Sequence, residues 1–83
     1  MDLSEVLIKL SNIIDAHHYM SSDIGVSLIY MKGKGHECVI FSATNGESKE
    51  LKFTESEKYA HNLNINKIER FLKNEITFDQ LFN

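Results

Sequence analysis

The dipeptide Asn45-Gly46 lies between two runs of strand-forming residues, at 37–43 and 49–53. The tight turn of a β-hairpin requires positive φ at its central positions, and Asn and Gly tolerate this conformation best. The dipeptide therefore predicts a hairpin, with positive φ at Gly46. A third run at 24–31, followed by the glycine-rich turn 32–36, predicts a further strand paired with the first of these runs.

The register of the Asn-Gly hairpin depends on the length of its loop. If the loop is the dipeptide alone, Ile40 lies opposite Leu51 and Cys38 lies opposite Phe53. Side chains alternate between the two faces of a strand, so these four residues share one face. We expect them to be buried together under a helix.

The sequence is compatible with two registers for the glycine-rich hairpin. A two-residue loop would place Val26, Leu28 and Tyr30 on one face with Val39 and Phe41, and a three-residue loop would exchange the two sets of side chains. Under either register both faces of the sheet carry apolar residues. Both faces therefore need to be covered.

The clearest helix spans residues 3 to about 20. Its apolar side recurs with helical spacing and comprises Leu3, Val6, Leu7, Leu10, Ile13, Ile14 and His17. Asp2 and Glu5 have the spacing of a capping box at its start. Ile8 and Tyr19 project from the opposite side of this helix, where they are candidates for a partner surface.

The chain after Phe53 contains two further capping-box sequences, at 54–57 and 77–80. Between them, two apolar stripes are out of phase: Tyr59, Ala60 and Leu63 form the first, and Ile65, Ile68, Phe71 and Leu72 form the second. One straight helix cannot bury both stripes. We therefore place a break within 62–66, with Asn64 as the N-cap of the following helix, and a short docked turn at 78–82.

These elements predict one small α+β domain over residues 1–83, in the order α-β-β-β-α-α, with a three-stranded antiparallel sheet packed with helices. A single cysteine excludes an internal disulfide and is consistent with a cytoplasmic protein. The N-terminal residues lack the pattern of a signal peptide, and no apolar stretch is long enough to span a membrane.

The histidines and the cysteine are the candidate residues for catalysis or metal binding. His36 and Cys38 are two residues apart on a predicted strand, so they share a face. A metal site or a small Cys-His hydrolase would need His17 or His61 to converge with them. The apolar register favours a buried structural thiol at Cys38 instead. We expect no catalytic, metal or cofactor-binding residue.

Nucleic-acid binding is the leading alternative function. A basic patch would comprise Lys32 and Lys34 in the glycine-rich turn and Lys49 and Lys52 on the last strand. The net charge of −3 disfavours general binding to a phosphate backbone. The glycine-rich turn also lacks the spacing of a phosphate-binding loop.

A non-enzymatic interaction protein is the function that we expect first: an inhibitor or accessory protein that binds and blocks a protein partner. Small phage and mobile-element proteins of the anti-defence type share this size and this lack of a reaction site, which is an analogy of size only. The expected partner residues are Val26, Leu28, Tyr30, Val39 and Phe41 on one sheet face, with Ile8 and Tyr19 as the alternative patch. An apolar surface of this kind also predicts a homodimer.

Overall fold

The fold is built on three antiparallel strands, β1 (Val26–Met31), β2 (Cys38–Thr44) and β3 (Ser48–Thr54), which lie in the order β1-β2-β3. The structure is a computed structural model, and it describes residues 1–17, 25–33 and 35–83. The helices are α1 (Leu3–His17), α2 (His61–Leu72) and α3 (Phe78–Leu81), and the 3-10 helix η1 (Glu55–Ala60) precedes α2. The predicted α+β domain and its order of elements are confirmed.

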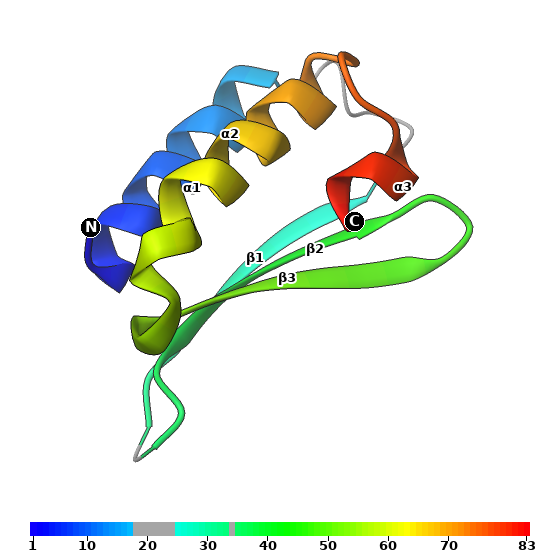
Figure 1. Cartoon of the computed structure of the whole chain (residues 1–83). Coiled ribbons are helices and arrows are strands. Elements are labelled where there is room, and N and C mark those ends of the chain that lie inside the picture. Colours follow the sequence, from blue (N-terminus) through cyan, green and yellow to red (C-terminus); the bar gives the residue numbers. More distant parts are fainter. Residues whose placement is uncertain (18–24, 34) are drawn as a thin grey trace.

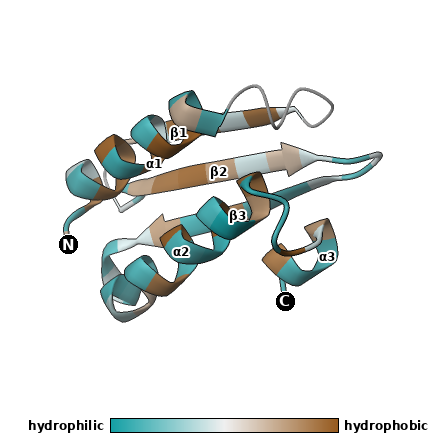
Figure 2. Cartoon of the chain, turned by 90° about the horizontal axis from the view of Figure 1, so that it is seen from above, coloured by the Kyte–Doolittle hydropathy of each residue, from teal (hydrophilic) through white to brown (hydrophobic). Residues whose placement is uncertain are grey.

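The described helices lie on one face of the sheet (Figure 1). Seen from above, α1 lies on the β1 side of the sheet and α2 lies on the β3 side (Figure 2). We call this the covered face, and we call the opposite face, on which no described helix lies, the open face. The expectation that helices would cover both faces is therefore not met within the described residues.

The register of β2 and β3 differs from the predicted one by a single residue. Val39 lies opposite Phe53, and Phe41 lies opposite Leu51. The loop contains three residues, 45–47, and Gly46 has the predicted positive φ, at 81°. A three-residue loop with glycine in the left-handed region is the next most common hairpin connection.

The one-residue shift places the larger apolar side chains under the helices. Phe53 and Leu51 now share a face with Val39 and Phe41, whereas Cys38 moves with Ile40 to the open face. In the first hairpin Leu28 lies opposite Phe41, so the grouping expected for a two-residue loop holds. The buried core on the covered face comprises Leu3, Val6, Leu10, Val39, Phe41, Ala43, Phe53, Ile65, Ile68, Phe71, Leu72 and Leu81.

Of the three predicted capping-box sequences, two make a capping hydrogen bond. At α1, the Glu5 backbone N–H donates to Asp2 Oδ1 at 2.9 Å. At α3, Thr77 and Gln80 form the complete capping box, with reciprocal hydrogen bonds of 2.8 and 3.1 Å. At the start of η1, Thr54 makes no capping hydrogen bond, and its hydroxyl lies 3.2 Å from Ser56 Oγ instead.

The predicted break within 62–66 is wrong, because α2 begins at His61 and continues through that segment. His61 occupies the buried stripe of α2, in phase with Ile65 and Ile68. Tyr59 and Leu63, which the sequence marks as apolar, are 87% and 61% exposed. The change of phase is thus accommodated at the junction of η1 and α2, and Asn64 is not an N-cap.

Candidate interaction surface

The centre of the open face is formed by four apolar side chains, which we call the apolar quartet: Ile29, Met31, Cys38 and Ile40. Ile29 lies directly opposite Ile40, and Met31 lies directly opposite Cys38, on neighbouring strands. Residues in such pairs are in contact across the sheet. Ile29 and Met31 are 50% and 45% exposed, whereas Cys38 is half-buried and Ile40 is 9% exposed, so Ile29 and Met31 form the exposed part of the quartet.

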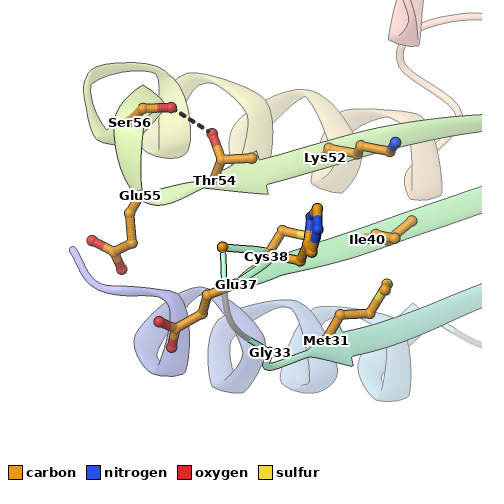
Figure 3. A pocket seen from close by; sticks show the side chains of 11 residues that line it. Met31, Gly33, Glu37, Cys38, Ile40, Lys52, Thr54, Glu55 and Ser56 are labelled. Carbon is orange, nitrogen blue, oxygen red and sulfur yellow. Dashed lines mark hydrogen bonds between the residues drawn. The ribbon is translucent and has the colours of Figure 1, made fainter.

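The quartet is bounded along β3 by charged residues. Lys52 lies opposite Ile40, and Glu50 lies opposite Ser42. Figure 3 shows the side chains of Lys52 and Ile40 on the same side of the sheet, with the helices behind it. The open face therefore has an apolar centre and a charged margin.

A hollow lies at the end of the open face next to the hairpin between β1 and β2 (Figure 3). Its lining comprises Met31, Gly33, Gly35, His36, Glu37, Cys38, Ile40, Lys52, Thr54, Glu55 and Ser56. Most of the apolar quartet therefore forms one wall of this hollow, and polar side chains form the rest.

Two carboxylates at the hollow hold fixed partners. The Tyr30 hydroxyl donates to Glu37 Oε1 at 2.7 Å, and this hydrogen bond raises the pKa of Tyr30 above its ordinary value. Glu55 lies 2.9 Å from Lys58 Nζ, and the hydrogen bond from that ammonium lowers the pKa of Glu55. Glu55 is therefore ionised at neutral pH, and the Lys58 ammonium lies beside its charge.

His36 and Cys38 both line the hollow, but His36 lies in the hairpin before β2 and is not on the strand as predicted. The third group of a catalytic or metal site does not join them. His61 is buried on the covered face with its ring against Phe53, and α1, which carries His17, lies on that face too. Among the described residues, no group of three or more His, Cys, Asp or Glu side chains could hold a metal ion.

The sheet residues expected to bind a partner lie on the covered face. Val39 and Phe41 are fully buried at 0% exposure. Val26, Leu28 and Tyr30 are half-buried against the same core. The predicted sheet-face site is therefore wrong, because the helices cover this face and leave the quartet on the other.

Of the two residues in the alternative partner patch, Ile8 and Tyr19, the structure describes only Ile8. Ile8 is 60% exposed, on the side of α1 away from the sheet, as predicted. Tyr19 lies outside the described residues. The apolar quartet is not among the partner residues expected from the sequence, although strict alternation along β1 identifies Ile29 and Met31 once the register is known.

Two lysines of the predicted basic patch, Lys49 and Lys52, lie on opposite faces of the sheet. Lys49 extends over the covered face, where its Nζ lies 3.7 Å from Asp79 Oδ1 and 5.6 Å from the centre of the Phe78 ring. Lys52 lies on the open face, and Lys32 is exposed beside the β1–β2 hairpin. Lys34 lies outside the described residues. The sheet thus separates Lys49 from Lys52.

No helix among the described segments has the length and apolar character needed to cross a membrane. Comparison of the chain with known protein families, curated proteins and solved structures gives no match.

Proposed function

We propose that this protein is a non-enzymatic interaction module that binds a protein partner through the open face, as an inhibitor or an accessory protein. The observation that carries the proposal is the exposure of Ile29 and Met31 beside Cys38 and Ile40, on a sheet whose other face is covered. A contiguous exposed apolar patch on a globular domain marks an interaction site more often than scattered surface residues do.

The arrangement of the open face matches the anatomy of protein interfaces. Such interfaces have an apolar centre from which water is excluded and a polar rim that remains hydrated. The quartet supplies the centre, and Lys52, Glu50 and Glu55 supply charges at the rim. Met31 adds an unbranched, flexible side chain that adapts to different partner shapes.

A protein partner fits this surface better than a nucleic acid does. Binding to phosphates needs several cations on one surface. Here Lys49 and Lys52 extend from opposite faces, and Glu50 is next to Lys52 on the open face. The net charge of −3 adds repulsion from a polyanion.

The test uses two isoleucines that are similarly exposed on different surfaces, Ile29 at 50% and Ile8 at 60%. A photo-reactive amino acid is placed at one position or the other, and each protein is irradiated in lysate of the source cells. We expect a discrete cross-linked protein from position 29 and none from position 8. Excess wild-type protein should compete with that product, whereas excess Met31→Asp protein should not.

Cross-linking of equal strength from both positions would contradict the proposal, and so would competition by Met31→Asp that matches the wild type. A matched pair of substitutions provides the control for folding. Ile29→Glu and Ile8→Glu each add one carboxylate at an exposed isoleucine, so both substitutions should change the midpoint of thermal unfolding by a similar amount. Only Ile29→Glu should lose binding of the partner.

A further inference from the structure

His61 is a buried histidine for which the fold provides no hydrogen bond. It is 1% exposed, and it is the one polar residue buried in the described part of the chain. Neither Nδ1 nor Nε2 has a hydrogen-bond partner among the described residues. A neutral imidazole carries one N–H donor and one acceptor nitrogen, so leaving both unpaired in the core costs stability that a phenylalanine would not lose.

The position of His61 gives this cost a structural consequence. η1 contains no buried residue, so its own side chains do not anchor it to the core. Along the chain, the nearest buried residues on either side of η1 are Phe53 and His61. Their rings are 5.5 Å apart between centroids, at an interplanar angle of 58°. This ring contact therefore closes the segment 54–60.

Besides this ring contact, η1 is held by Glu55, whose carboxylate accepts a hydrogen bond from the Leu3 backbone at the start of α1. The Lys58–Glu55 ion pair is exposed and contributes little. Glu57 has non-helical dihedral angles of −112° and 31°, so the 3-10 helix is interrupted. The packing of His61 against Phe53 is the contact between buried side chains that lies at the boundaries of η1.

Charges of both signs act on His61. The amino group of Met1 and the Lys58 ammonium disfavour a positive imidazolium, whereas Glu55 and Glu57 favour it. Burial is the largest effect, and it lowers the pKa of His61 below its ordinary value. An imidazolium would bring two unpaired N–H donors and a charge into the core. Protonation therefore favours departure of the ring from its site.

We propose that His61 is a proton-operated latch: the neutral ring packs against Phe53 and holds η1 on the domain, and the protonated ring leaves this site and releases η1. Release also changes the hollow, because Glu55 and Ser56 form part of its wall. Any effect of this change on partner binding rests on the proposed function of the open face, whereas the latch itself does not.

The experiment follows backbone amide exchange and the His61 ring by NMR in the isolated chain between pH 7.5 and 5.5. Exchange rates are corrected for their intrinsic pH dependence. In the wild type, protection of the η1 amides should fall with acidification by up to about tenfold per pH unit, the limit for one proton. The His61 ring should titrate over the same range, while the amides of α3 keep their protection.

His61→Phe keeps a ring in the site without a titrating group, and His61→Leu is a second variant should the first not fold. In either variant the pH dependence at η1 should disappear, whereas His36→Gln, at an exposed histidine, should retain it. Equal pH dependence in His61→Phe would overturn the latch. It would also be overturned by simultaneous loss of protection in η1 and α3, or by a His61 titration without any change in η1. Since no partner is present, none of these results bears on the proposed function.

Discussion

Val39 lies directly opposite Phe53 across β2 and β3, and both side chains are fully buried beneath the helices. This pair places the core on the face of Phe53 and leaves Ile29 on the open face. Phe53→Ala should therefore destabilise the protein by about 3–5 kcal/mol, through lost burial and a cavity. Ile29→Ala should cost less than about 1 kcal/mol, since the side chain is already half-exposed.

Chemical denaturation measures both free energies of unfolding. A register with a two-residue loop would place Cys38, instead of Val39, opposite Phe53 in the core. A larger loss for Cys38→Ala than for Val39→Ala would thus contradict the observed pairing, because it would place the thiol in the core.

Gly46 provides a test of backbone conformation that is independent of packing. Its φ is 81°, and a Cβ added there would meet nothing within 4 Å. Gly46→Ala should destabilise the protein by about 1–2 kcal/mol, because non-glycine residues disfavour the left-handed region. Gly46→Asn should lose less than this, since Asn tolerates that region.

Gly33 is the matched control for Gly46. A Cβ at Gly33 also meets nothing within 4 Å, and its φ lies outside the left-handed range. Gly33→Ala should leave the thermal midpoint nearly unchanged. A drop as large as that of Gly46→Ala would show that conformation is not the cause.

The sequence identified the elements whose signals are local. Asn45-Gly46, the Asp2 cap and the Thr77–Gln80 capping box each act within a few residues, and each is present in the fold. The register was missed because Asn-Gly is compatible with loops of two and three residues, and one residue exchanges the faces. For the same reason Val39 and Phe41 were expected on an exposed face, whereas the structure buries them.

The start of α2 was misplaced for a different reason. Tyr59 and Leu63 are apolar and His61 is polar, so periodicity alone favours burial of the first two. The structure buries His61 instead, where it contacts Phe53. This exchange depends on a tertiary contact, which the local pattern does not contain.

Stability should depend on pH through His61. Burial lowers the pKa of His61 in the folded state, whereas the unfolded chain binds that proton near the ordinary value of about 6.5. The stabilisation is therefore complete above about pH 6.5 and is lost as the pH falls toward the folded-state pKa, by at most about 1.4 kcal/mol per pH unit. Denaturation at a series of pH values between 7.5 and 5.5 measures this slope. In His61→Phe the slope should be smaller, and an unchanged slope would assign it to other groups.

The capping box of α3 gives a prediction with an internal control. Thr77 Oγ1 accepts a hydrogen bond from the Gln80 backbone N–H at 3.1 Å, whereas Thr54 occupies the N-cap position of η1 without such a bond. Thr77→Ala should cost about 1 kcal/mol. Thr54→Ala should cost less, since it removes only the contact with Ser56. Amide exchange at Leu81, whose N–H donates to the Thr77 carbonyl, locates the effect. Equal losses in both variants would contradict the role assigned to the cap.

Self-association of the protein can show whether the quartet on the open face or the outer side of α1 around Ile8 forms contacts between copies. If the quartet is not occupied by a foreign partner, two copies can cover it by packing their open faces about a two-fold axis, the commonest closed arrangement. We expect a dimer at tens of micromolar by light scattering. Ile29→Glu should convert it to a monomer, because each carboxylate would be buried at the interface without a partner. Ile8→Glu, on α1, should leave the dimer intact. Dissociation by Ile8→Glu alone would assign association to the outer side of α1, and a wild-type monomer would leave the open face to a foreign protein.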